Sequence, residues 1–129
     1  MNCPVCKKPM IILELNQVEI DFCDTCEGIW LDAGEIELLL NDSPGKDNVF
    51  SSLTSIANVK EKKIRCPLCN KKMDKVKIDA GGLVIIDKCK LNEGYWFDKN
   101  ELQKILSVNL DVDNPVIKQI QEMFAYKLK

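Results

Sequence analysis

Seven cysteines are the residues of this chain whose type and spacing could do chemistry. Four of them form the pattern C-x2-C-x16-C-x2-C, namely Cys3, Cys6, Cys23 and Cys26. Two cysteines three residues apart on a tight turn can both bind one ion, and two such pairs complete a tetrahedral set of thiolates. We expect a closed structural zinc site here. Disulfides and rubredoxin-like iron are the alternatives.

The other three cysteines, Cys66, Cys69 and Cys89, repeat the pattern with Asn92 in place of the fourth. An amide oxygen is a poorer zinc ligand than a thiolate, and the chain has no histidine. Three thiolates still predict a second zinc ion, completed by Asn92, water or a nearby carboxylate. A metal-free site held by its apolar core is the alternative. We predict no catalytic residue, because only Glu93 and Asp87 could act as a base beside an open zinc position.

A hairpin must bring the two cysteine pairs of each set together. Residues 10–15 are apolar enough for a strand, and residues 18–22 alternate apolar and acidic, which is typical of a half-buried return strand. Asp32 with Glu35 three residues later predicts a capping box and a helix through residue 40. Between them we expect Gly28 to form a backbone turn and Trp30 to fill the space between hairpin and helix.

The second set of cysteines belongs to an internal repeat. Residues 66–69, 73 and 84–101 match residues 3–6, 10 and 18–35 in order. Leu83 to Ile86 form the return strand, and Gly94, Trp96, Asp98 and Glu101 stand at the equivalent late positions. The two tryptophans could stack on nucleic-acid bases, but their place between knuckle and capping box favours core packing. Helix capping likewise explains the two Asp/Glu pairs without catalysis.

The predicted fold is therefore small α+β and zinc-stapled, with two tandem zinc-ribbon-like units. Each unit holds a zinc knuckle, a β-hairpin, a second knuckle and a short helix. We place the first unit at residues 1–42, the second at 64–108, and a linker at 43–63 in which Phe50, Leu53 and Ile56 have the spacing of a short helix. Residues 109–129 predict an amphipathic helix that begins near Asn114 and Pro115.

Charge is unevenly distributed along the chain. The net charge of −2 gives no general reason to bind nucleic acid, yet residues 1–42 carry nine acids against two lysines, and residues 60–77 carry eight bases against two acids. The basic segment offers one candidate nucleic-acid site, with a solvated surface as the favoured interpretation: Lys60, Lys62, Lys63, Arg65, Lys71 and Lys72. The opposite charges, or the C-terminal helix, could also join two chains as a homodimer.

The motif C-P-x-C, a hairpin and C-x-x-C-x-G-x-W-L-D-x-G-E resembles the transcription-factor-IIB-type zinc-finger family of small, mostly prokaryotic proteins. The first copy matches at every one of these positions. The second departs from the motif at Asn92, Phe97 and Asn100. The resemblance implies a zinc-ribbon-like hairpin with a short helix, and it implies little about activity.

From these features we expect a non-enzymatic, zinc-binding interaction module with a protein partner, in a transcription-related role. One alternative is nucleic-acid binding through residues 60–77, and another is a metal- or redox-responsive protein with a labile second site. No apolar stretch is long enough for a signal sequence or a membrane span, and the cysteine spacing fits a reducing compartment, so we expect a cytoplasmic protein without membrane contact.

Overall fold

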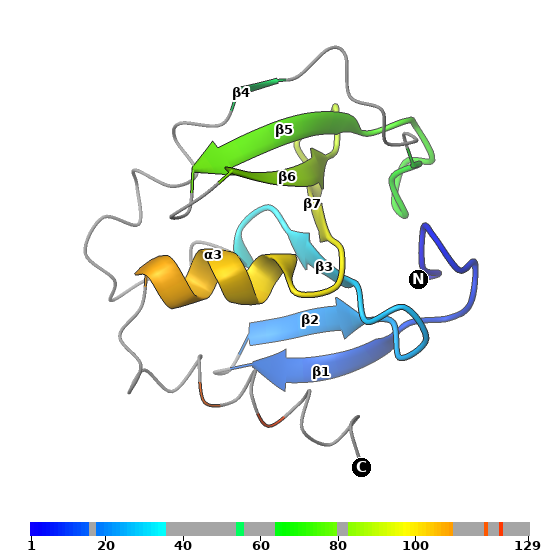
Figure 1. The fold of residues 1–129 in the computed structure, drawn as a ribbon. Coiled ribbons are helices and arrows are strands. Elements are labelled where there is room, and N and C mark those ends of the chain that lie inside the picture. Colours follow the sequence, from blue (N-terminus) through cyan, green and yellow to red (C-terminus); the bar gives the residue numbers. More distant parts are fainter. Residues whose placement is uncertain are drawn as a thin grey trace.

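A computed structural model describes residues 1–15, 18–35, 54–55, 64–79 and 83–109, together with Lys118 and Glu122. Within these residues the strands form one seven-stranded sheet in the order β1-β2-β3-β7-β6-β5-β4 (Figure 1). The strands are β1 (Ile11–Leu15), β2 (Val18–Phe22), β3 (Ile29–Asp32), β4 (Thr54–Ser55), β5 (Asp74–Asp79), β6 (Leu83–Lys88) and β7 (Gly94–Phe97). One helix, α3 (Glu101–Asn109), follows the last strand.

Each sequence repeat supplies a hairpin and a third strand. The hairpins β1-β2 and β5-β6 confirm the predicted strands, and the second hairpin extends two residues beyond Ile86. The third strands, β3 and β7, were missed. They are four residues long and nearly continuously buried, so they show no alternation of apolar and polar residues by which a strand is recognised.

The two repeats meet at the centre of the sheet rather than lying as separate units. Strand β3 pairs with β7 in antiparallel orientation, and Trp30 lies directly opposite Trp96. Because the paired strands are equivalent in the two copies, the sheet has a pseudo-two-fold axis between the tryptophans. The two repeats therefore share one continuous sheet.

The two faces of the sheet carry different cores, because side chains alternate along each strand. On one face, Phe22, Ile29 and Phe97 form a buried row across three strands. Helix α3 contacts β6 and buries Leu102 and Ile105 completely. On the other face, both tryptophans pack in one buried cluster with Met73 and the cysteines.

Of the helices predicted outside the hairpins, one is confirmed and one is wrong. The helix after Asp98 is confirmed as α3. The short helix predicted within residues 43–63 is wrong at Thr54 and Ser55, which form β4 against Val76 and Lys77 at the edge of the second hairpin. The β-branched Thr54 suits this pairing. Most of residues 36–53 and 110–129 lie outside the described residues, so the helix after Glu35 and the C-terminal amphipathic helix remain predictions.

Candidate metal centres

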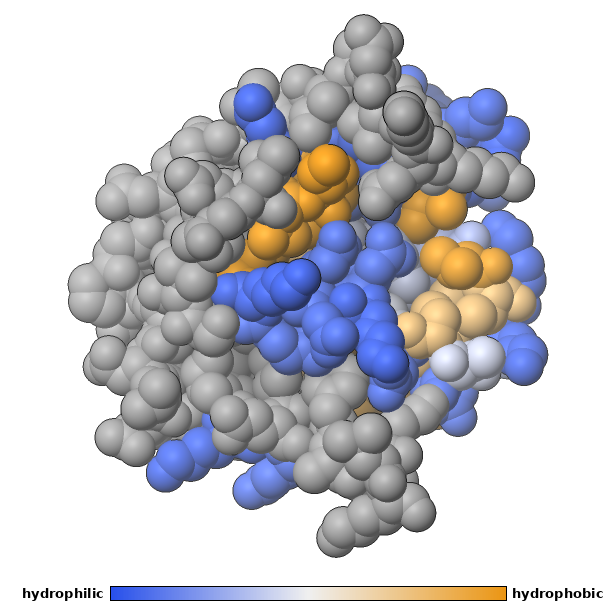
Figure 2. Space-filling view, in the orientation of Figure 1, coloured by the Kyte–Doolittle hydropathy of each residue, from blue (hydrophilic) through white to orange (hydrophobic). Residues whose placement is uncertain are grey.

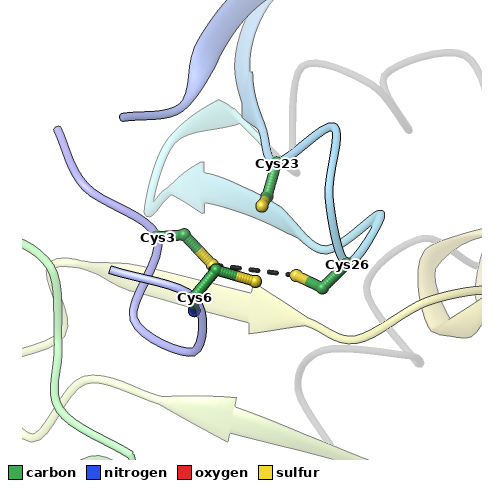
Figure 3. Close-up of side chains that lie close together, drawn as sticks. All are labelled: Cys3, Cys6, Cys23 and Cys26. Carbon is green, nitrogen blue, oxygen red and sulfur yellow. Dashed lines mark hydrogen bonds between the residues drawn. The ribbon is translucent and has the colours of Figure 1, made fainter. Parts of the chain in front are cut away.

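Two equivalent turns build the first cysteine cluster. Cys3 and Cys6 come from the N-terminal loop, while Cys23 and Cys26 follow strand β2 (Figure 3). In each turn the first cysteine accepts a backbone hydrogen bond four residues on: the N–H of Lys7 donates to Cys3 O at 2.9 Å, and that of Glu27 to Cys23 O at 2.8 Å. Both donors have a left-handed backbone, with φ of 65° at Lys7 and 64° at Glu27. This turn aims both sulfurs of a pair to one side.

The spacing of the four sulfurs fits a zinc ion. All four lie within 4.8 Å of one another, and the sulfurs of Cys3 and Cys26 are 3.7 Å apart. Zn–S bonds of about 2.3 Å in a tetrahedron place sulfurs about 3.8 Å apart, whereas a disulfide requires about 2.05 Å. All seven cysteines of the chain are free thiols. The disulfide alternative is therefore excluded by this geometry.

The electrostatics of the first cluster also call for a cation. Burial raises the pKa of Cys3 and of Cys26. Burial also acts to raise the pKa of Cys23, but hydrogen bonds from the backbone N–H groups of Cys26 and Thr25, together with those to the thiols of Cys26 and Cys3, lower that pKa to about 7. At Cys3, the N–H groups of Val5 and Cys6 donate to the sulfur at 3.4 and 3.2 Å. Such N–H donors stabilise a thiolate. A bound dication would favour deprotonation of the remaining thiols to thiolates as well.

The second cluster brings together Cys66, Cys69, Cys89 and a carboxylate. The sulfurs of Cys69 and Cys89 are 3.7 Å apart, as in the first cluster. The thiol of Cys89 lies 3.5 Å from Oε1 of Glu93, and the four ligand atoms are all within 4.8 Å of one another. A tetrahedral zinc ion with Zn–S near 2.3 Å and Zn–O near 2.0 Å separates sulfur from oxygen by about 3.5 Å. This donor set therefore also fits zinc.

A tighter turn explains why Glu93, and not Asn92, takes the fourth place. The N–H of Asn92 donates to Cys89 O at 3.0 Å, three residues on instead of four. The left-handed residue correspondingly moves from Glu27 to Asn92, where φ is 59°. Asparagine adopts this conformation more readily than most residues. Asn92, the predicted fourth ligand, is exposed, and the neighbouring carboxylate of Glu93 takes its place in the cluster, as one of the predicted alternatives requires.

Each cluster is closed by residues of the other repeat. Gly28 follows the first cluster and lies under the ring of Trp96, while Gly94 follows the second cluster and lies under the ring of Trp30. The predicted packing of Trp30 between its own hairpin and helix stays a prediction, because residues 36–40 lie outside the described residues. The pairing of β3 with β7 carries each tryptophan diagonally across to the opposite copy's glycine, and a sequence repeat alone does not reveal such an exchange.

The remaining predicted polar residues have structural partners. Asp32 and Asp98 each accept a hydrogen bond from Nε1 of the tryptophan two residues earlier, at 2.8 and 2.9 Å. Their backbone N–H groups donate to Glu35 and Glu101 at 2.7 Å, which is one of the two hydrogen bonds of a capping box. The prediction that Asp98 caps the helix is nevertheless wrong. Asn100 has a left-handed φ of 71° and its carbonyl accepts the N–H of Lys104, so α3 begins after Asn100 and the Asp98/Glu101 pair closes the turn before it. Both tryptophans are fully buried, as expected of core residues.

The basic segment is only partly described. Arg65, Lys71 and Lys72 are exposed beside the second cluster, and the Arg65 guanidinium donates to Asn70 O at 2.9 Å. Lys60, Lys62 and Lys63 lie outside the described residues. In the part of the chain that the structure describes, no helix is long and apolar enough to cross a membrane.

Comparison with known proteins agrees with this geometry. No curated protein and no solved structure matches the chain. The sequence pattern of the transcription factor zinc-finger family matches it twice, over residues 2–42 and 65–108. Together with the two ligand clusters, this match shows that the protein binds Zn²⁺ at two sites. The chain belongs to the transcription factor zinc-finger family, whose domain it carries in two copies.

Proposed function

We propose that this protein is a non-enzymatic interaction module, in which zinc holds a protein-binding surface at the knuckles. The observation that carries the proposal is an exposed apolar side chain at the tip of three of the four cysteine turns. Val5, Leu68 and Leu91 are 47%, 48% and 54% exposed. A short turn bound to metal cannot bury its tip, so these side chains are held rigidly in solvent, where a partner could cover them.

The surroundings of these tips suggest the chemistry of the partner. Figure 2 shows apolar surface at the right-hand edge of the molecule, where Figure 1 places the N-terminal loop and the loop before β5, with hydrophilic residues around it. Exposed lysines flank the tips, among them Lys8, Lys71 and Lys72. We infer a protein partner that offers apolar side chains together with carboxylates. The family's name makes the transcription machinery the first place to look for it.

Nucleic-acid binding through the basic segment is the second candidate, supported by the exposed Arg65, Lys71 and Lys72. The burial of both tryptophans weakens it, because neither can act as a stacking platform for a base. Binding through these cations alone would be sequence-independent and strongly dependent on salt.

A photo-crosslinker at Leu68 tests the proposal in cells. We expect one predominant protein adduct. The triple variant Val5→Thr, Leu68→Lys, Leu91→Thr substitutes Leu68 itself, so the crosslinker is moved to Lys71 for this comparison. We expect the adduct to be lost in this variant. Threonine is compatible with a knuckle tip, because Thr25 occupies that position in the first cluster. Ile12→Thr is the matched control, since Ile12 is 66% exposed on strand β1. Equal adducts in both variants, or a nucleic-acid adduct that dominates at low salt, would refute the protein-binding proposal.

A further inference from the structure

One glutamate of the repeat has a different role at each zinc site. Glu27 and Glu93 occupy the same position of the repeat, one residue before the glycine that a tryptophan covers. Glu27 forms an ion pair with Lys99 of the other copy, with 2.9 Å between Oε2 and Nζ. Glu93 instead directs its carboxylate to the sulfur of Cys89. The same side chain is thus a surface ion-pair partner in one copy and a member of the metal cluster in the other.

The residue on the opposite copy explains the difference. The repeat equivalent of Lys99 is Ala33. The backbone N–H of Ala33 donates to Glu93 O at 2.9 Å, so Ala33 stands beside Glu93 as Lys99 stands beside Glu27. A methyl group offers no cation to the Glu93 carboxylate. Glu93 is therefore left for the metal, while a lysine at this position would compete with the metal for it.

From this juxtaposition we propose that Cys66, Cys69, Cys89 and Glu93 form an exchangeable zinc site, weaker than the four-cysteine site, and that Ala33 is the positioning residue that reserves Glu93 for the metal. The inference rests on zinc binding by the chain and is independent of the proposed protein partner. Zinc is borderline soft and binds thiolate more strongly than carboxylate, so exchange of one thiolate for Glu93 weakens this site relative to the other.

The geometry of the turn at Cys89 also favours loss of zinc from the second site before the first. The sulfur of Cys89 accepts the N–H of Leu91 at 3.3 Å, while the next N–H, from Asn92, goes to the carbonyl of Cys89. In the first cluster the sulfur of Cys3 accepts two such N–H groups, from Val5 at 3.4 Å and from Cys6 at 3.2 Å. The tighter turn at Cys89 thus leaves its sulfur with one fewer of these backbone donors. Both differences point the same way, so zinc is expected to leave the second site first.

Stepwise removal of zinc from the full chain tests the proposal. The zinc-loaded protein is equilibrated with increasing chelator, and native mass spectrometry counts the zinc ions that remain. We expect two steps, separated by about ten-fold or more in free zinc concentration. Cobalt(II) in place of zinc assigns them, because its visible absorption differs between a four-thiolate and a three-thiolate site. A wild-type protein that loses both ions in one step, or loses the four-thiolate ion first, would overturn the proposal.

Variants at two positions test the roles of Glu93 and Ala33. We expect Glu93→Gln and Ala33→Lys each to weaken zinc binding at the second site by about ten-fold, so that only the first step of zinc loss shifts. Ala33→Gln, similar in length to lysine but uncharged, and Lys99→Ala, which frees Glu27, should leave both steps in place. Ala33 is exposed, so its substitutions are compatible with folding, and near-ultraviolet circular dichroism checks this. If Glu93→Gln leaves the first step unmoved, Glu93 is not a ligand; if Ala33→Lys and Ala33→Gln behave alike, Ala33 has no positioning role.

Discussion

Trp96 of the second repeat packs against Gly28 of the first, so closely that a Cβ atom on Gly28 would overlap Cζ2 of the ring. The pseudo-two-fold axis repeats the contact between Trp30 and Gly94, where an added Cβ would lie 2.6 Å from Cζ2 of Trp30. Since each glycine directly follows a metal cluster, these two contacts join the zinc sites to the centre of the sheet. The fold therefore depends on both copies being present.

Substitution of either glycine tests this interlock. Gly28→Ala and Gly94→Ala should each lower the free energy of unfolding by about 2–4 kcal/mol, because the buried tryptophan opposite cannot move aside. Gly34→Ala is the control, since nothing lies within 4 Å of an added Cβ there. Urea unfolding of the zinc-loaded proteins measures the difference. A change at Gly28 no larger than that at Gly34 would show that the two copies are not interlocked.

The buried ion pair on the tryptophan face belongs to the second copy alone. Lys75 Nζ lies 2.7 Å from Oδ1 of Asp87, and the two side chains are 5% and 1% exposed. Lys75→Met should lower the free energy of unfolding by about 3–5 kcal/mol, because it leaves a carboxylate buried without this cation. Addition of Asp87→Asn should recover part of the loss.

The matched control for this pair is Lys90→Met. Lys90 is half exposed and its Nζ lies 4.0 Å from Asp74, so its loss should change the free energy of unfolding by less than about 1 kcal/mol. Equal effects at Lys75 and Lys90, compared by urea unfolding, would contradict the structural role of the buried pair.

The hydrogen bond from Trp96 to Asp98 predicts a selective effect at the turn before α3. Asp98→Ala removes the acceptor for Nε1 of a buried tryptophan, so we expect a loss of about 1–3 kcal/mol in the free energy of unfolding. Asp98→Asn keeps an oxygen acceptor and should cost less than half as much. Thermal unfolding followed by tryptophan fluorescence compares the two variants. The prediction is wrong if the asparagine and alanine variants are equally destabilised.

The acidic first copy should show a pH dependence of its own. Burial, with the Asp32 and Glu19 carboxylates, raises the pKa of Asp21 above its ordinary value of 3.8. The folded protein then keeps this proton to a higher pH than the unfolded chain does, so the Asp21 contribution to stability falls as pH rises from about 4 through the raised pKa. Asp21→Asn should remove this fall and leave the variant more stable at pH 7.

The size of that gain is limited by solvent, because Asp21 is only partly buried, and we expect less than about 1 kcal/mol. Urea unfolding in excess zinc between pH 5 and 8 compares the variant with the wild type. A variant less stable than the wild type at pH 7 would show that Asp21 makes a favourable contact as a carboxylate.

Local sequence patterns predicted the parts of the fold that local physics determines. The alternation in residues 18–22 placed β2 at the bounds observed. The Asp/Glu spacing found the hydrogen-bonded pair of Asp98 and Glu101, although this pair closes a turn before α3 instead of capping the helix. The four-cysteine cluster followed from spacing alone, because two short turns and one hairpin suffice to close it.

The parts that sequence did not predict depend on the second copy. Pairing of β3 with β7, and the packing of each tryptophan on the other copy's glycine, join residues 62 to 68 positions apart, and no local period records them. The fourth member of the second cluster was misplaced by one residue for a different reason. The alignment of the repeats put Asn92 opposite Cys26, but the left-handed backbone at Asn92 shortens the turn and brings in Glu93. The preference of asparagine for that conformation was the signal available in the sequence.

The zinc content of the intact chain tests the central claim, that both clusters bind metal, most directly. Native mass spectrometry of the purified protein should find two zinc ions per chain, and it should find two again in Asn92→Cys, because Asn92 is exposed and the second cluster is complete without it. A single zinc ion in the wild type that rises to two in Asn92→Cys would contradict the account.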